Sequence, residues 1–240
     1  MAEKILVASG KGGVGKSTFT AGISKELSSR GKKVLAIDCD IGLRSLDLLL
    51  GCSADVVFDW GDVILGRCTV NQAILTGDVD FIAAPGSTNE EFTGEAFREM
   101  VESVSAGYDY IFIDSPAGIG HGMQLAACGA EKAVVITTPD NICVRSCSRA
   151  FSELEKLGKN DIRLVINMFE AKQVVKGKLL NVDECIDETG VQLLGVIPMD
   201  RSLGFTSVTG DDPGEYSPSS LAFERIAGRL EGEKIKLVCQ

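Results

Sequence analysis

Long apolar runs are missing from this chain of 240 residues, and their absence excludes one class of protein. No stretch approaches the ~20 consecutive apolar residues that a membrane-spanning helix needs. The apolar run near the N-terminus is short and leads into a glycine-rich loop, so the pattern of a signal peptide is not met. We therefore expect a cytoplasmic protein.

Paired cysteines are missing too, although the chain has eight cysteines. None forms the Cys-x-x-Cys or Cys-x-Cys pair that is typical of a tight metal site. We expect these thiols to be small buried residues in a reducing cytosol, with an iron–sulfur or metal role as the alternative. The only tryptophan, Trp60, is expected to pack in the core rather than on a partner surface.

Positive charge is in deficit, since 24 basic residues face 34 acidic ones and the formal net charge is -10. The net negative charge repels the phosphates of nucleic acid and opposes nonspecific binding, so no nucleic-acid partner is expected. No repeat or linker rich in Pro, Gly or Ser divides the chain. We predict a single domain over residues 1–240, with a short C-terminal tail at 231–240.

Short apolar runs recur along the chain, with helical patterns between them. Continuous runs of this kind, rather than alternating ones, are typical of strands buried on both faces. The helical stretches 18–31 and 141–158 both end in glycine. This alternation predicts an α/β fold with a doubly wound, mostly parallel sheet flanked by helices. The apolar runs are residues 4–9, 33–40, 79–86, 108–116, 132–140, 162–169 and 193–200.

Polar residues follow these predicted strands. Ligands of such sheets bind beyond the carboxyl ends of the strands, so these residues should converge on one edge. They are the loop 10–18, Asp38, Asp40, Asp114, Asn167 and Asp200.

The segment SGKGGVGKST, residues 9–18, fits two phosphate-binding patterns. Gly10, Gly12 and Gly15 match the dinucleotide fingerprint G-x-G-x-x-G, for which Asp38 would be the ribose-binding acid. The same loop satisfies G-x-x-x-x-G-K-[ST], because Lys16 and Ser17 follow Gly15, and a dinucleotide site does not need them. We favour the second pattern, a P-loop that binds ATP or GTP.

The P-loop interpretation gives each residue type a physical role. Backbone N–H groups of the glycines curl around a phosphate at the positive end of the following helix. Lys16 adds charge at the β- and γ-phosphate oxygens, Ser17 offers a hydroxyl to Mg²⁺, and Asp114 holds that metal through water. The expected nucleotide contacts of the loop are Gly10, Lys11, Gly12, Gly13, Val14, Gly15, Lys16, Ser17 and Thr18.

The segment KGGVGKST at 11–18 resembles the deviant Walker A motif of the ParA/MinD family of P-loop ATPases. DCDIGLRSLDLLLG at 38–51 and DSPAGIGHG at 114–122 resemble the switch segments of its division-site positioning members. TTPDNICVRSCSRA at 137–150 and GVIPMD at 195–200 extend the resemblance over nearly the whole chain. It implies a Mg²⁺-dependent ATPase that converts ATP and water to ADP and phosphate, forms an ATP-bound homodimer and takes part in septum-site determination.

The resemblance also implies catalytic roles. Lys11 would reach across the dimer to phosphates bound by the other subunit, where a cation neutralises charge on the leaving oxygens, and Lys16 would act within its own subunit. Asp40 would orient the attacking water, since a carboxylate near its reference pKa is a weak base.

Further residues match the family at the metal and the base. Asp38 corresponds to an acid near the metal, and Gly118 to the switch II amide that senses the γ-phosphate. Asn167 corresponds to the adenine-recognising amide, with Pro198 and Asp200 in the loop that flanks the base.

The implied partners are a second copy of the chain, a division-inhibitor protein and a regulator that activates the ATPase. Membrane-associating members end in a basic amphipathic helix, whereas EGEKIKLVCQ at 231–240 has no aromatic residue. We expect weak membrane affinity and a peripheral place at the inner face of the cell membrane. The alternatives are a ParA-like partition ATPase that binds DNA, which the acidic charge opposes, and a metallocluster carrier, which needs paired cysteines.

Overall fold

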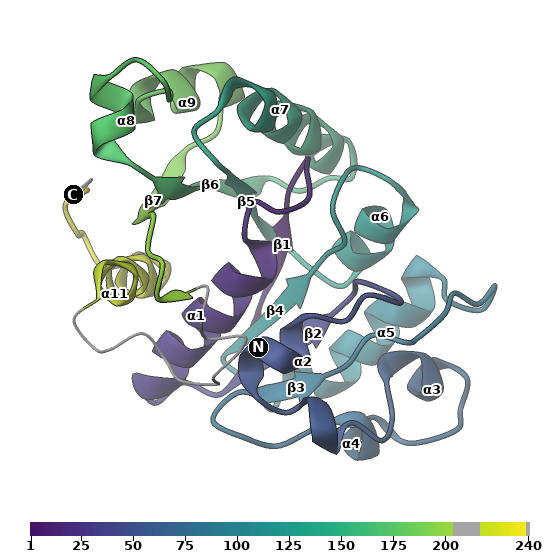
Figure 1. The fold of residues 1–240 in the computed structure, drawn as a ribbon. Helices are drawn as coiled ribbons and strands as arrows, with labels where there is room; N and C mark the ends of the chain where they lie inside the picture. The colour runs from purple at the N-terminus through teal and green to yellow at the C-terminus, as the bar shows by residue number, and fades with distance from the viewer. Residues whose placement is uncertain (204–216, 239–240) are drawn as a thin grey trace.

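A seven-stranded parallel sheet forms the centre of the protein (Figure 1). The computed structural model describes residues 1–203 and 217–238. The strand order is β3-β2-β4-β1-β5-β6-β7, which confirms the predicted doubly wound α/β fold. The strands are β1 (Glu3–Ala8), β2 (Val34–Asp38), β3 (Asp80–Ile82), β4 (Tyr110–Asp114), β5 (Lys132–Thr137), β6 (Asp161–Phe169) and β7 (Leu193–Pro198).

Apolar side chains cover both faces of the sheet, which explains why the strands are continuous apolar runs. Along β1, Ile5 and Val7 belong to one core cluster, and Leu6 and Ala8 belong to the other. All four residues are at most 1% exposed. Successive side chains of a strand point to opposite faces, so each face needs its own layer of helices.

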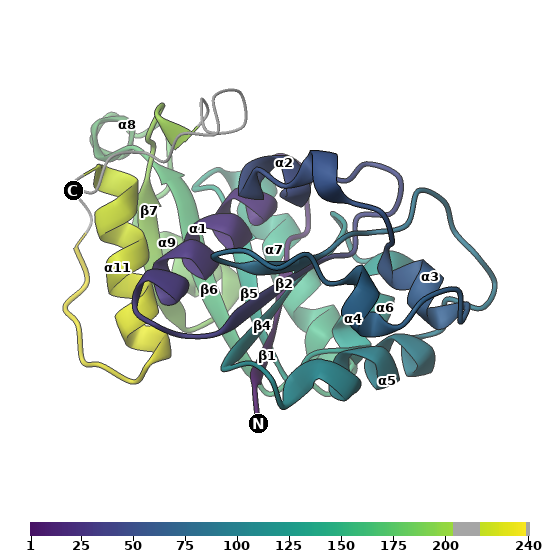
Figure 2. The ribbon, with the colours of Figure 1, turned by 90° about the horizontal axis from the view of Figure 1, so that it is seen from below.

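Two long helices, α1 (Lys16–Ser29) and α11 (Pro218–Leu230), pack on the face that carries Ile5 and Val7 (Figure 1). They approach closely at Gly22, where a Cβ atom would overlap the ring of Phe223. Figure 2 shows α11 beside β7 at one end of the sheet and α3 and α4 at the other end.

The opposite face carries α5 (Gly94–Ser105), α6 (His121–Cys128) and α7 (Asn141–Lys156). Phe97 and Val101 of α5 and Val144 of α7 join the core cluster of Leu6. The remaining helices are α2 (Leu46–Leu50), the 3-10 turn η1 (Ser53–Asp55), α3 (Trp60–Ile64), α4 (Val70–Ala73), α8 (Ala171–Val175) and α9 (Val182–Thr189).

Each of the seven predicted apolar runs overlaps a strand, but most strands end before the run does. The run 33–40 is a strand only over Val34–Asp38, because the chain then turns, with the N–H of Asp40 bonded to the Asp38 side chain. Trp60 is completely buried, which confirms its place in the core. Within residues 1–203 and 217–238, each helix is too short or too polar to cross a membrane.

Candidate nucleotide site

The loop after β1 and the ends of the central strands form the candidate site. Residues 9–15 connect β1 to α1, and β1 lies between β4 and β5. Asp38 and Asp114 are register partners at the carboxyl ends of β2 and β4. The predicted loop and both acids therefore meet at one edge of the sheet, as the topology of a parallel α/β sheet requires.

Two glycines of the loop have conformations or neighbours that exclude a side chain. Gly15 has φ of 92°, and a Cβ atom there would overlap the side-chain amide of Asn167. A Cβ atom on Gly10 would overlap the backbone carbonyl of Ser146 in α7. The first glycine thus lets the loop pass α7, and the last sets the turn into α1.

The start of α1 is built as an anion site. No side chain caps the helix, and its first turn holds no acidic residue. The first N–H groups of a helix have no partner within the helix, and its dipole is positive at this end. Lys16 is the first helical residue and is 8% exposed, so its charge lies in a largely water-excluded place. This combination suits a phosphate group.

Asp38 is held rigidly by backbone donors. Its Oδ1 accepts from the N–H of Asp40 at 2.8 Å, and its Oδ2 accepts from Ser45 at 3.3 Å and Leu46 at 3.2 Å. The residue is 0% exposed. Burial raises the pKa of Asp38, and the backbone hydrogen bonds oppose this rise. The Asp38 carboxylate thereby fixes the backbone of the segment that follows β2.

Asp114 differs from Asp38 because one of its buried oxygens is unsatisfied. Among the described residues, nothing hydrogen-bonds its Oδ2, and Oδ1 accepts a long bond of 3.5 Å from Thr20. Burial and the nearby charge of Asp38 raise the pKa of Asp114 to about 7, against the opposing effects of Ser17 and Lys16. A buried carboxylate oxygen needs a hydrogen-bond donor or a cation. Two carboxylates and the Ser17 hydroxyl are hard oxygen donors, so this set fits Mg²⁺ bound partly through water.

Three residues of the site lay outside the predictions made from sequence. The hydroxyl of Ser45 donates to that of Ser17 at 3.2 Å. Thr20 bonds Asp114, and the indole N–H of Trp60 donates to the carbonyl of Asp38 at 2.9 Å. None of the three lies in the P-loop pattern, and their roles depend on contacts that sequence spacing does not reveal.

Lys11, Asp40 and Gly118 follow the carboxyl ends of β1, β2 and β4. Lys11 is exposed, and its carbonyl accepts from the Ser9 hydroxyl at 2.8 Å. Asp40 is half-buried, and no described residue bonds its side chain. The N–H of Gly118 donates to the carbonyl of Ser9 at 2.9 Å, so in this conformation the predicted γ-phosphate sensor is bonded to the phosphate loop.

Asn167 lies near the end of β6, directly against the loop. Its side-chain amide donates to the carbonyl of Val14 at 2.8 Å, and the residue is 6% exposed. The next residue, Met168, has a positive φ of 55°, where the register between β6 and β7 shifts. That irregularity ends the regular ladder at the position where Asn167 meets the loop.

Pro198 ends β7, and Asp200 follows it. The Asp200 carboxylate accepts from the hydroxyl groups of Ser202 at 2.6 Å and Ser219 at 2.7 Å, and from both backbone N–H groups. Partial burial opposes ionisation, but these bonds outweigh it and lower the pKa of Asp200 to about 2. Asp200 therefore ties the end of β7 to the start of α11.

A cavity of about 360 Å³ adjoins the site between the segments after β2 and β4. Asp40 and His121 line it together with the apolar side chains of Ile41, Phe92 and Met123. His121 begins α6 and is exposed.

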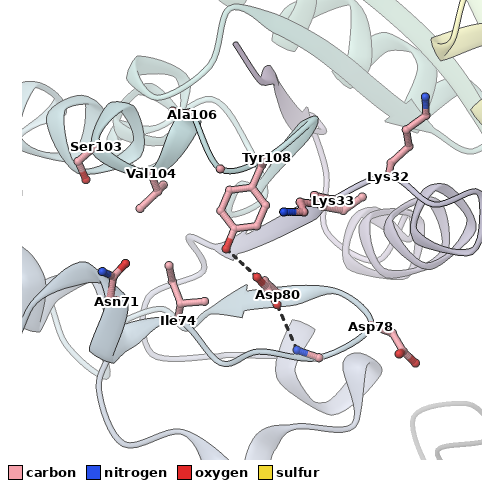
Figure 3. A pocket seen from close by; sticks show the side chains of 13 residues that line it. Lys32, Lys33, Asn71, Ile74, Asp78, Asp80, Ser103, Val104, Ala106 and Tyr108 are labelled. Atoms are coloured by element: carbon pink, nitrogen blue, oxygen red, sulfur yellow. Dashed lines mark hydrogen bonds between the residues drawn. The ribbon is translucent and has the colours of Figure 1, made fainter.

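A second cavity, of about 480 Å³, lies at the opposite edge of the sheet, near the starts of β2 and β3. Figure 3 shows the Tyr108 hydroxyl aimed at Asp80, to which it donates at 2.7 Å. The N–H of Gly77 donates to the other oxygen of Asp80 at 3.2 Å. Asp80 is thus satisfied by the protein itself, unlike Asp114.

The thiols contribute no cluster in the part of the chain that is described. Cys143, Cys147 and Cys185 are buried, and burial raises the pKa of Cys147 and Cys185 to about 12. In residues 1–203 and 217–238, no three His, Cys, Asp or Glu side chains are grouped so that they could hold a metal ion. The last cysteine, Cys239, lies outside the described residues.

Comparison with protein families gives a match over residues 1–230 to the ParA model, described as NUBPL iron-transfer P-loop NTPase. Among curated proteins, the septum site-determining protein MinD of Synechocystis sp. is 36% identical over 239 residues, which span 96% of this chain and 90% of the relative. MinD of Bacillus subtilis is 34% identical over 248 residues, which span 99% and 92%.

Solved structures give a consistent result. The MinD cell division protein of Aquifex aeolicus has a TM-score of 0.90 at 34% identity, over 99% of this chain and 100% of that one. The MinC:MinD complex of the same organism gives 0.89 at 35% identity, over 99% and 98%. MinD of Pyrococcus horikoshii, complexed with Mg-ADP, gives 0.85 at 28% identity, over 96% of each chain.

Proposed function

The chain belongs to the MinD family of ParA-type P-loop NTPases, and on that basis we propose that it is a Mg²⁺-dependent ATPase acting as a dimerising switch in the placement of the division site. One observation carries the nucleotide part of this proposal. A signature phosphate loop, an uncapped helix start and a buried carboxylate oxygen without a partner meet at one edge of the sheet. The match to a MinD solved with Mg-ADP supports the choice of ligand.

In this proposal, the loop 10–18 holds the phosphates through backbone N–H groups, and Lys16 neutralises charge on the β- and γ-phosphate oxygens. Ser17 and Asp114 hold Mg²⁺, with Asp38 beside them. When bound, Mg²⁺ supplies positive charge at the phosphate oxygens and an acceptable partner for the unsatisfied Oδ2 of Asp114. Asn167 recognises adenine, with Pro198 and Asp200 flanking the base.

Hydrolysis in this proposal depends on two further side chains. Asp40 orients the attacking water, for which its half-buried carboxylate, without a bond from the described residues, is suited. Lys11 reaches the phosphates of the partner subunit, as its exposure allows. Gly118 exchanges its bond to the Ser9 carbonyl for one to the γ-phosphate, which would report the state of the nucleotide to the segment 114–122.

Exposed apolar side chains at the nucleotide edge support the dimer. Leu43 is 78% exposed, Ile119 is 43% exposed and Ile142 is 67% exposed. They follow β2, β4 and β5, so all three belong to the edge that carries the phosphate loop. A face-to-face dimer would remove them from water and would place each Lys11 near the partner site.

The remaining partners are a division inhibitor, a regulator that activates the ATPase, and a membrane surface. The MinC:MinD complex of Aquifex aeolicus supports the first of these. The described part of the tail gives little support to strong membrane binding, because it folds back on α11. Arg229 donates to the carbonyls of Ile235 and Lys236, the latter at 2.9 Å, and Arg30 pairs with Glu231 at 2.9 Å. We propose a peripheral, weakly held fraction at the inner face of the membrane.

The dimer is tested with a substitution that blocks hydrolysis. Asp40→Ala protein with ATP and Mg²⁺ should double its mass in light scattering, and with ADP it should stay a monomer. Asp78→Asn, which changes an exposed carboxylate at the opposite edge, is the matched control and should dimerise only transiently as ATP is consumed. A monomeric Asp40→Ala protein that binds ATP would contradict the switch.

A further inference from the structure

The indole of Trp60 contacts the metal side of the candidate site from within the core. The residue is 0% exposed, and its N–H donates to the backbone carbonyl of Asp38 at 2.9 Å. This bond runs from the first residue of α3 to the last residue of β2. It joins a core aromatic side chain to the residue that we assign beside the magnesium.

The Asp38 carbonyl needs this donor because the neighbouring strand has ended. Pairing between β2 and β3 stops at Ile37 and Ile82, whereas pairing on the other side of β2 continues to Asp38. Beyond β3, Ala83 bridges to Asp59, and its carbonyl accepts from the N–H of Trp60. The indole N–H therefore substitutes for the ladder donor that a longer β3 would have provided.

The ring of Trp60 has little freedom to move. It meets Phe92 edge-on, with ring centroids 4.9 Å apart, and Phe97 in the same way at 5.3 Å. The start of α3 is fixed by a capping box between Asp59 and Asp62. A side chain held by two aromatic neighbours and at its backbone is a precise donor.

The orientation of the Asp38 peptide decides where its carboxylate lies. That carboxylate also accepts hydrogen bonds from the backbone N–H groups of Asp40, Ser45 and Leu46. A turn of the Asp38 backbone would therefore displace the carboxylate and the following segment together. Losing the donor to its carbonyl would favour such a turn, because a buried carbonyl without a partner is costly.

We propose that Trp60 is a positioning residue for the magnesium site: its indole N–H fixes the carbonyl of Asp38 and thereby the orientation of the Asp38 carboxylate. This inference rests on the proposed function, since it presupposes that Asp38 serves Mg²⁺. It assigns Trp60 no contact with nucleotide or metal. Its effect should therefore appear in the Mg²⁺-dependent part of nucleotide affinity alone.

The sharpest test removes the N–H and keeps the shape of the ring. Trp60 is the only tryptophan of the chain, so biosynthetic replacement of tryptophan by 3-benzothienylalanine changes this position alone. ADP affinity is measured by calorimetry with Mg²⁺ and with EDTA. The ratio of the two affinities should fall about three- to tenfold, the size of one lost hydrogen bond, while the affinity in EDTA stays unchanged.

Phe97→Leu is the matched control, because it loosens the same aromatic cluster and leaves the indole N–H in place. It should lower Tm and leave the affinity ratio unchanged. An unchanged ratio in the analogue protein, or an equal fall in Phe97→Leu, would overturn the inference. Trp60→Phe, checked for folding by circular dichroism, is a second route to the same comparison.

Wild-type protein gives an independent readout. The emission of Trp60 should shift when Mg²⁺ is added to the ADP complex, and a constant emission would count against the proposal. Failure of the proposed function has a different signature, namely wild-type protein that does not bind ADP either with Mg²⁺ or with EDTA.

Discussion

The side-chain amide of Asn167 donates to the carbonyl of Val14 and so fastens the end of β6 to the phosphate loop. The two residues are 153 positions apart in the chain. The same amide occupies the place that a Cβ atom on Gly15 would take. The loop is therefore shaped from outside by β6 as well as by its own glycines.

Gly15→Ala should destabilise the protein and abolish ADP binding. A positive φ of 92° costs a non-glycine residue about 1–2 kcal/mol, and the overlap with Asn167 adds to it. The double variant Gly15→Ala, Asn167→Ala removes the overlap and keeps the strained φ. Urea unfolding should show that the two substitutions together cost less than the sum of their separate effects. Strict additivity would contradict the packing of Asn167 on Gly15.

Asp114→Asn should make the ligand-free protein more stable and abolish the gain in ADP affinity from Mg²⁺. The substitution removes one of two neighbouring buried carboxylates whose charges oppose each other. We expect the free energy of unfolding, measured with urea at pH 7.5, to rise by about 0.5–2 kcal/mol. The variant should also lose ATPase activity. Asp78→Asn serves again as the control and should change neither quantity. A variant less stable than wild type would refute the repulsion.

Asp200 should contribute to the acid limb of the stability curve. Its pKa is lowered to about 2 in the folded protein, below the value of 3.8 that it has without these partners. The unfolded state therefore binds the proton first, and the stabilisation that is present above about pH 4 is lost as the pH falls toward 2. Chemical unfolding of Asp200→Asn should show that its free energy of unfolding falls less steeply with decreasing pH over this range than that of wild type. Superimposable slopes for variant and wild type would count against the assignment.

The two lysines of the loop should separate in function. Lys16→Ala should lose most ATP affinity, because Lys16 is buried at the start of α1. Lys11→Ala should keep more of that affinity and lose hydrolysis, because in our proposal the exposed Lys11 serves the partner subunit. Calorimetry with ATP and a phosphate-release assay measure the two effects. Equal loss of binding in both variants would exclude the role in the partner site.

Much of the fold was predictable because it depends on periodicity. Strands buried on both faces must be continuous apolar runs, and seven such runs gave seven parallel strands. The strand ends were less predictable. Beyond Asp38, a hydrogen bond from the N–H of Asp40 to the Asp38 side chain replaces the backbone hydrogen bonds between strands. The apolar content of the sequence does not reveal this change.

The candidate site was predictable where one short segment holds all the partners, as in residues 10–18. It was not predictable where a contact joins distant segments. Trp60 is 22 residues from Asp38, and Thr20 is 94 residues from Asp114. Asp200 matched a base-flanking position in the sequence, whereas its observed bonds tie β7 to α11. Only the folded chain reveals these contacts.

The helix α1 has a mechanical consequence, because its two ends meet different parts of the protein. It begins at Lys16 in the phosphate site and extends over about 21 Å at ~1.5 Å per residue. Arg30, directly after it, binds Glu231 of the tail and the carbonyl of Glu224 in α11. A continuous helix moves as one rod. Tension applied to the C-terminal tail would therefore be transmitted along α1 to the candidate phosphate site. A cargo fused to the tail would therefore pull on the proposed phosphate site.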